Sequence, residues 1–224
     1  QLSGYPLFAD ALSVVRFGPH VPEGAVIGGY ETFLRSPINI PQPDLVLSFG
    51  AEPISKRLDN YLAGCDSAVH IHVRENGVWA DARHLTSHFL QVNPTVLCST
   101  LAKQLNSQRE STWLGKWQQV ETAYWAELSR AMDQMDFDGA YVADLLDLLA
   151  DGSTLFTGNS LPVRHVDQFG KPKEKRIQVF ANRGASGIDG NLSTGLGIAR
   201  HNLKPTTILT GDITFYHDSN GLLA

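Results

Sequence analysis

The sequence has few of the residues on which several protein classes depend. It contains two cysteines, and no run reaches the ~18 consecutive apolar residues of a membrane helix. Lys and Arg number 18 against 23 Asp and Glu, and the Lys and Arg residues do not gather in one run. These absences argue against a disulfide framework, a membrane protein and a general nucleic-acid binder. We therefore expect a cytoplasmic protein from a reducing compartment.

The rest of the composition is that of a globular protein. Hydrophobic residues make up 42% of the chain, which can supply a sizeable core. At roughly 100–200 residues per domain, 224 residues fit one large domain or two small ones. The chain begins without Met and stops in a helix-like pattern at 220–224, so we expect a piece of a longer polypeptide.

Apolar runs rich in β-branched residues alternate with helical patterns, which predicts an α/β protein with a parallel sheet. The apolar positions between Trp113 and Met135 recur at intervals of 3 to 4, which predicts one long amphipathic helix. We expect a domain boundary near 136–139, which gives domains 1–137 and 138–224. The expected strands are 44–50, 68–73, 154–157, 176–181 and 206–210; the further expected helices are 140–150, one from Leu161 and 190–200.

Two histidine pairs have spacings that could bind a transition metal. His70 and His72 alternate on an expected strand, and His84 and His88 are four residues apart on a possible helix. Two ligands do not make a site, so we expect satisfied or exposed histidines rather than a metal centre. The charged segment 170–175 is expected to be a solvated loop.

Three segments in the second half share one layout, in which a strand is followed by small residues and the start of a helix. In such sheets, ligands bind at the carboxyl ends of the strands, where helix N-termini present N–H groups. In the first segment, Ser160 can cap a helix, and Arg164 projects from the same face four residues later. Together they would clamp a carboxylate, although spacing alone favours an ordinary cap with a surface arginine.

The other two segments are a glycine-rich loop and a Gly-Asp pair. Glycines 184, 187 and 190 follow Arg183 and would let a ligand approach the backbone, but an ordinary glycine-rich connection is about as plausible. Their spacing is G-x-x-G-x-x-G, so it supports NAD binding only weakly. Asp212 follows Gly211 after an apolar strand, which suits Mg²⁺, although Gly-Asp is also a common turn.

Taken together, these segments resemble the 2-succinyl-5-enolpyruvyl-6-hydroxy-3-cyclohexene-1-carboxylate synthases, which are thiamine-diphosphate enzymes of menaquinone and phylloquinone biosynthesis. The residues that carry the resemblance are Gly158-Asn159-Ser160-Leu161-Pro162-Val163-Arg164, 182–190 with Ser193-Thr194, Gly211-Asp212, 215–218 and 220–223. Weaker similarity covers 4–10, Leu12-Ser13, Phe49-Gly50 and 56–58.

The resemblance implies which part of the enzyme this chain is. It corresponds to the Rossmann-like central domain followed by the first part of the diphosphate-binding domain. The N-terminal pyrimidine-binding domain, with the glutamate that activates the cofactor, would lie outside the chain, as would the remaining metal ligands. We therefore expect the fragment alone to be inactive. The longer protein would be a homodimer or homotetramer.

The resemblance also implies a reaction: decarboxylation of 2-oxoglutarate and addition of the succinyl unit to isochorismate. The implied cofactors are thiamine diphosphate and Mg²⁺ (or Mn²⁺). Ser160 and Arg164 would bind the succinyl carboxylate, and Arg183 would act on a substrate carboxylate or the intermediate. The remaining implied roles are isochorismate binding by Lys56 and Arg57, and cofactor binding by Ile188, Gly211, Asp212, Ile213 and Thr214, with Asp212 also a metal ligand.

Two other functions remain open from the sequence. One is a different thiamine-dependent decarboxylase or carboligase, such as a relative of acetolactate synthase. The Ser160 and Arg164 pair and the loop at 184–190 argue against it. The other is a non-catalytic Rossmann-like module that binds a nucleotide or FAD, which flavin absorbance would reveal.

Overall fold

The secondary structure alternates between strands and helices along most of the chain. A computed structural model describes residues 3–79, 81–105 and 111–223, so the first two residues and Ala224 lie outside it. The strands are β1 (Leu7–Phe8), β2 (Val26–Ile27), β3 (Leu45–Phe49), β4 (Val69–Val73), β5 (His88–Leu90), β6 (Thr154–Thr157), β7 (Gln178–Phe180) and β8 (Thr206–Leu209). The α-helices are α1 (Tyr30–Phe33), α2 (Lys56–Ala63), α3 (Pro94–Gln104), α4 (Thr112–Gln134), α5 (Asp138–Leu148), α6 (Leu161–Phe169), α7 (Asn191–Asn202) and α8 (Asp212–His217); η1 (Val21–Glu23) and η2 (Ser219–Leu223) are 3₁₀ turns.

Every strand pairing in the described residues is parallel, which confirms the α/β fold class. The strands form three sheets with the orders β1-β2, β3-β4-β5 and β7-β6-β8. β6 is the central strand of the third sheet: Thr154 pairs with Gln178 of β7 and with Thr206 of β8. All four residues of β6 are buried, as expected for a strand covered on both faces.

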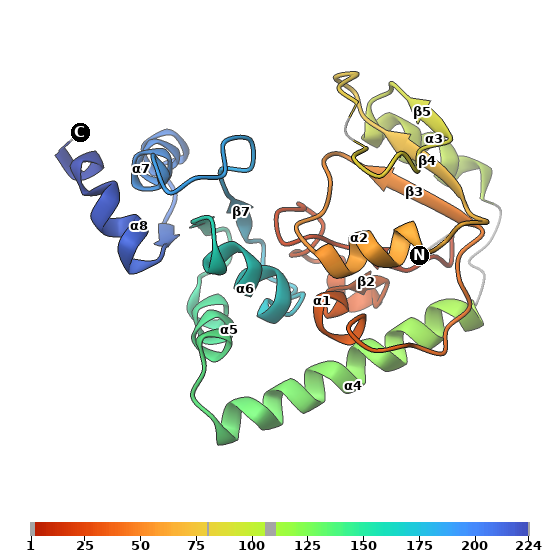
Figure 1. Ribbon diagram of the computed structural model, residues 1–224, viewed down its shortest axis with the longest axis horizontal. Coiled ribbons are helices and arrows are strands. Elements are labelled where there is room, and N and C mark those ends of the chain that lie inside the picture. The colour runs from red at the N-terminus through yellow and green to blue at the C-terminus, as the bar shows by residue number, and fades with distance from the viewer. Residues whose placement is uncertain (1–2, 80, 106–110, 224) are drawn as a thin grey trace.

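The long helix predicted from the tryptophan spacing is α4. Figure 1 shows it running from the N-terminal sheets to α5. Ser111 caps it, because the Ser111 hydroxyl accepts a hydrogen bond from Leu114 N at 3.2 Å. Trp117 is fully buried and meets the Phe8 ring edge-on, with ring centroids 4.9 Å apart. Trp117 and Trp125 of this helix are therefore part of the core. No described helix combines the length and the hydropathy that crossing a membrane requires.

Two local predictions are wrong. The expected helix with His84 and His88 on one face does not form, because His84 lies in a turn with φ 55° and His88 begins β5. The segment 170–175 is not simply a solvated loop. Gly170 is buried, and Gly18 N donates to Lys173 O at 2.9 Å. The prediction of satisfied or exposed histidines holds for His84 and His88, which are exposed, but not for His72, which is buried on β4 with no hydrogen-bond partner for its Nε2 in the described residues.

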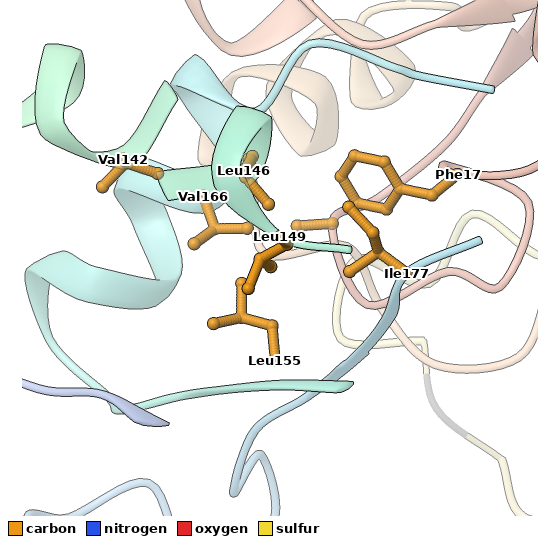
Figure 2. Close-up of a cluster of buried hydrophobic side chains, with 8 residues drawn as sticks. Phe17, Val142, Leu146, Leu149, Leu155, Val166 and Ile177 are labelled. Carbon is orange, nitrogen blue, oxygen red and sulfur yellow. The ribbon is translucent and has the colours of Figure 1, made fainter. Parts of the chain in front are cut away.

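One hydrophobic cluster joins the N-terminal segment to the third sheet and its helices. Figure 2 shows Phe17 and Ile177 beside Leu146 of α5 and Leu155 of β6. The cluster thus contains residues from both sides of position 137. The division into domains 1–137 and 138–224 stays a prediction.

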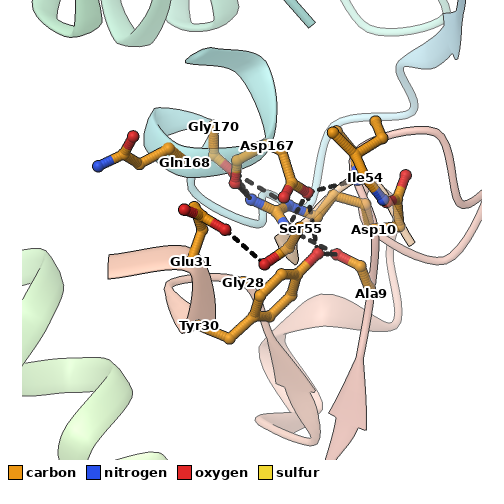
Figure 3. Close-up of polar contacts among 12 residues, drawn as sticks. Ala9, Asp10, Gly28, Tyr30, Glu31, Ile54, Ser55, Asp167, Gln168 and Gly170 are labelled. Carbon is orange, nitrogen blue, oxygen red and sulfur yellow. Dashed lines mark hydrogen bonds and ion pairs between the residues drawn. The ribbon is translucent and has the colours of Figure 1, made fainter. Parts of the chain in front are cut away.

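A buried arginine makes a second connection between the same parts of the chain. Arg16 is fully buried, and its guanidinium donates to the carbonyl oxygens of Ala9 (2.6 Å), Asp167 (2.7 Å) and Gly170 (2.7 Å) (Figure 3). The Asp167 carboxylate lies 3.7 Å from the same guanidinium. Asp167 Oδ1 also accepts from Ala11 N at 3.0 Å and from the Tyr30 hydroxyl at 2.8 Å. We call Asp10, Arg16, Tyr30 and Asp167 the Arg16 cluster.

Substitution of Arg16 should be among the most destabilising changes in the chain. Arg16→Met keeps the aliphatic stem but leaves three carbonyl oxygens without their donor and Asp167 without its cation. We expect the free energy of unfolding, measured with urea, to fall by about 3–5 kcal/mol. The control is Arg130→Met, which breaks the exposed pair with Glu127 and should cost less than about 1 kcal/mol. Equal effects of the two substitutions would contradict the interpretation.

The Arg16 cluster should also make stability depend on pH. Burial raises the pKa of Asp167 from 3.8 to about 7; the Arg16 charge lowers it and the nearby Asp10 raises it. A carboxyl whose pKa is higher in the folded state contributes stability that is present below its unfolded pKa and lost as the pH rises through about 7.

The Asp167→Asn variant tests this pH dependence. Asparagine keeps an acceptor oxygen for Ala11 N and Tyr30, but it does not titrate. In urea titrations between about pH 5 and about pH 8, the wild-type protein should lose stability that the variant does not lose. Parallel curves for the two proteins would show that Asp167 does not titrate in this range.

Candidate functional site

The candidate site lies at the carboxyl ends of β6, β7 and β8. Gly158 N donates to Leu209 O at 2.7 Å, which ties the residue after β6 to the last residue of β8. A Cβ at Gly158 would lie 3.1 Å from Thr210 Oγ1, so a side chain there would require Thr210 to shift by a few tenths of an ångström. The loops 158–160, 181–190 and 210–211 therefore leave the sheet side by side.

Asn159 connects two of these loops. Its side chain is buried, its Nδ2 donates to Gly187 O at 2.8 Å, and its Oδ1 accepts from Arg183 Nη1 at 3.1 Å. One amide thus fixes both the arginine and the backbone of the glycine-rich loop. The prediction assigned no role to Asn159. The available signal was its place between Gly158 and Ser160, directly after a buried strand.

Ser160 is placed differently from the prediction. It precedes α6 with φ 70° and ψ −129°, and its side chain makes no capping hydrogen bond, so the predicted side-chain cap is wrong. This conformation costs a residue other than glycine about 1–3 kcal/mol. The Ser160 carbonyl instead accepts from Arg164 Nη1 at 2.7 Å. The predicted proximity of Ser160 and Arg164 is present, and both residues are exposed.

The backbone of the glycine-rich loop is hydrogen-bonded on its buried side and exposed to solvent on its outer side. Asn191 is buried, and its Nδ2 donates to Ile188 O at 2.8 Å and to Gly187 O at 3.2 Å. Residues 183–187 are exposed, and a Cβ at Gly184 or Gly190 would meet no atom within 4 Å. The loop therefore offers free backbone on its outer side, while Ile188 is half-buried.

The predicted cofactor residues Gly211, Asp212, Ile213 and Thr214 lie where β8 gives way to α8. Asp212 is exposed in the first turn of α8, Ile213 is 65% exposed and Thr214 is buried. A Cβ at Gly211 would meet no atom within 4 Å, so this backbone is open as well. Asp212 is the acidic residue of this turn, and its carboxylate faces solvent at the edge of the sheet.

The end of α8 is tied to the glycine-rich loop and to α7. Asp218 Oδ2 accepts from Leu192 N (2.7 Å) and Ser193 N (3.1 Å), so a side chain already occupies two N–H groups at the N-terminus of α7. His217 bonds Asp189 in the loop, and this hydrogen bond lowers the pKa of Asp189. An anion at this edge would therefore meet Arg164 of α6 and Arg183 of the glycine-rich loop rather than the first turn of α7.

Lys56 and Arg57 lie on a different element from the other candidates. They are exposed in the first turn of α2, which Ser55 caps by accepting from Leu58 N at 3.0 Å. Within the described part of the chain, no hydrogen bond or ion pair joins them to the loops after β6, β7 or β8. The structure thus brings Ser160, Arg164, Arg183 and Ile188 together and leaves Lys56 and Arg57 apart from them.

Two surface depressions lie away from these residues. One of about 480 Å³ is bordered by Tyr5, Asp44 and Trp113, and one of about 420 Å³ by Gly50, Arg74 and Pro94. Neither is lined by the candidate residues. The candidate site is thus an exposed edge rather than a cavity enclosed by this chain.

Comparison with known proteins gives a consistent result. Residues 1–157 match a family model described as the middle domain of thiamine pyrophosphate enzymes. The chain is 49% identical over 224 residues to a protein of Roseiflexus sp. (strain RS-1) and 50% identical over 226 residues to one of Roseiflexus castenholzii. A Bacillus cytotoxicus protein is 38% identical over 228 residues.

All three relatives carry the name 2-succinyl-5-enolpyruvyl-6-hydroxy-3-cyclohexene-1-carboxylate synthase. The matches cover 99–100% of this chain but 38% of each relative. The chain thus spans less than two fifths of the length of these relatives.

Asn159 should control the order of the glycine-rich loop. Asn159→Ala removes the donor to Gly187 O and the acceptor of Arg183, so we expect amide hydrogen exchange in 183–190 to speed up about tenfold or more, equivalent to ~1.4 kcal/mol. Asn220→Ala, an exposed residue of η2, is the control and should change nothing. Unchanged exchange in the Asn159 variant would show that the loop is ordered without this amide.

Proposed function

The chain belongs to the middle-domain family of thiamine pyrophosphate enzymes, and from this premise we propose that it is part of a 2-succinyl-5-enolpyruvyl-6-hydroxy-3-cyclohexene-1-carboxylate synthase. The reaction joins the succinyl unit of 2-oxoglutarate, after loss of CO₂, to isochorismate. This would serve the biosynthesis of menaquinone or phylloquinone.

The observation that carries the proposal is the linked group Arg183–Asn159–Ser160–Arg164 at the carboxyl edge of the third sheet. Both substrates are dicarboxylates, and the chain as a whole is acidic, so their binding requires local cations. Arg164 uses Nη1 on the Ser160 carbonyl, and its other N–H groups can bind a carboxylate. Arg164 and the Ser160 hydroxyl would therefore orient the distal carboxylate of 2-oxoglutarate.

Arg183 would have the catalytic role. Asn159 fixes its guanidinium at 3.1 Å, so the arginine is oriented before substrate arrives. A positioned cation can stabilise negative charge that develops on a substrate carboxylate during the addition step. Lys56 and Arg57 would bind isochorismate from the start of α2.

The residues at the edge fit thiamine diphosphate and a divalent cation in part. The open backbone at Gly190 and Gly211 leaves room for a large ligand, and Ile188 and Ile213 offer apolar contact. Asp212 supplies one carboxylate for Mg²⁺ or Mn²⁺, which takes one or two carboxylates together with phosphate oxygens. When bound, thiamine diphosphate supplies the carbon nucleophile and the electron sink for decarboxylation.

The remaining parts of the proposal concern the longer protein. Most of the candidate residues, among them Ser160, Arg164, Arg183 and Asp212, are exposed in this chain, so we propose that further chain covers them and completes the site. The fragment alone would then be inactive, and a homodimer or homotetramer in the cytoplasm would be the active form. Nucleic acid and membranes have no part in the proposed function.

The experiment follows 2-oxoglutarate consumption by the full-length protein with thiamine diphosphate and Mg²⁺, with and without isochorismate. Turnover should require isochorismate. Arg164→Ala should raise the KM for 2-oxoglutarate roughly 10- to 150-fold, because a hydrogen bond to a charged group contributes ~1.5–3 kcal/mol. Arg183→Ala should lower kcat by a similar factor. Arg200→Ala, which removes an exposed arginine in the last turn of α7, is the control and should have wild-type kinetics.

Each other outcome contradicts a specific part of the proposal. Consumption of 2-oxoglutarate that is indifferent to isochorismate would indicate another thiamine-dependent carboligase and remove the roles of Lys56 and Arg57. Flavin absorbance in the purified protein, without turnover, would indicate a nucleotide- or FAD-binding module. Wild-type kinetics in Arg183→Ala would remove that residue from the site.

A further inference from the structure

The Arg16 cluster lies between the two groups of proposed substrate-binding residues, although none of its members is proposed to touch substrate. We propose that Asp10, Arg16, Tyr30 and Asp167 are positioning residues that fix α2, which carries Lys56 and Arg57, relative to α6, which follows Ser160 and carries Arg164. The inference rests on the proposed function and adds to it residues to which neither motif spacing nor the resemblance assigned a role.

Two separate paths lead from Asp167 of α6 to the start of α2, and each passes through a pair of sequence neighbours. In the first path, Ala11 N donates to Asp167 Oδ1 at 3.0 Å, and the neighbouring Asp10 accepts from Ile54 N at 2.7 Å. Ile54 lies two residues before α2. This path therefore joins the two helices through the peptide bond between Asp10 and Ala11.

The second path passes through α1. The Tyr30 hydroxyl lies 2.8 Å from Asp167 Oδ1, and the neighbouring Glu31 accepts from the Ser55 hydroxyl at 2.5 Å. Ser55 is the residue that caps α2. Figure 3 shows Asp10, Tyr30, Ile54 and Ser55 gathered around Asp167.

Arg16 fixes the same, C-terminal end of α6 through its backbone. Its guanidinium bonds the carbonyl oxygens of Asp167 and Gly170, which lie in the last turn and at the C-cap of the helix. Asp167 follows Arg164 by one helical turn, and the helix rises ~1.5 Å per residue. A tilt or shift of α6 at Asp167 is thus passed along a rigid element to Ser160 and Arg164.

The polar and charged composition of the Arg16 cluster favours a role in positioning α2 and α6 over a role in stability alone. The hydrophobic cluster around Leu146 and Leu155 already buries apolar area between the N-terminal segment and α6, through Ala11, Phe17 and Val166. Buried charge is costly, and apolar side chains of similar size would often contribute as much stability. Directional bonds to Asp167 add a fixed geometry that apolar contacts do not specify. A displacement of about 1 Å can cost ~100-fold in rate when two reacting groups must meet.

The test separates the two half-reactions in the full-length protein. Tyr30→Phe keeps the buried ring and removes only the hydroxyl that bonds Asp167. In a single turnover without isochorismate, CO₂ is released from 2-oxoglutarate. This step needs Ser160 and Arg164 but not the residues on α2, so its rate should stay within about twofold of wild type. Isochorismate-dependent product formation needs the residues at α6 and those on α2 in the correct relative position, so its rate should fall about tenfold or more.

A second readout does not depend on activity. Amide hydrogen exchange in 161–169 and 54–63 should speed up together in Tyr30→Phe, because both segments depend on the same bonds. The matched control is Tyr61→Phe on α2, whose buried hydroxyl has no hydrogen-bond partner in the described residues. It should change neither the exchange nor the ratio of the two rates. Asp10→Asn weakens the first path and replaces Tyr30→Phe if that variant does not fold.

The results distinguish three accounts. A lower ratio of product formation to CO₂ release, with faster exchange in both segments, supports positioning. A proportional loss of both rates would show a merely structural role, and unchanged rates and exchange would show no role; either overturns the inference. A wild-type protein without isochorismate-dependent turnover would overturn the proposed function, and the exchange data would still report whether α2 and α6 are coupled.

Discussion

The arrangement of this chain depends on one buried cation. Arg16 has no contact with solvent, and it satisfies carbonyl oxygens from the N-terminal segment and from the end of α6 at once. A guanidinium in that position must be fully hydrogen-bonded, so the segments that supply its acceptors cannot move independently. Asp167 and Tyr30 then extend the constraint to α1 and, through Asp10 and Glu31, to the start of α2.

The candidate site takes its geometry from this constraint and from a second buried amide. Asn159 joins the loop after β6 to the loop after β7, and Arg183 is oriented by it. The strained backbone of Ser160 turns its carbonyl toward Arg164, which is consistent with a functional rather than a stabilising reason for that residue. Asp218 meanwhile accepts from two N–H groups at the N-terminus of α7, so these groups are already occupied.

Local pattern was sufficient for many of the elements, but it did not predict β1, β2, β5, α1 or α3, and it did not predict the contacts between elements. Strands such as β3 and β6 and the helix α4 were predicted because their apolar spacing repeats within a few residues. The bond between Arg16 and Asp167 joins residues 151 positions apart, and no local pattern encodes it. The side-chain cap at Ser160 was wrong because spacing does not reveal a positive φ. The charged composition of 170–175 gave no sign that Arg16 would bury Gly170.

A crystal structure of the full-length protein with 2-oxoglutarate is the most direct test, because we propose that the edge around Asn159 binds the carboxylate of this substrate. The account predicts a substrate carboxylate within hydrogen-bond distance of Arg164 and the Ser160 hydroxyl, with Arg183 still bonded to Asn159. A substrate carboxylate bound elsewhere, with Arg164 facing open solvent, would contradict it.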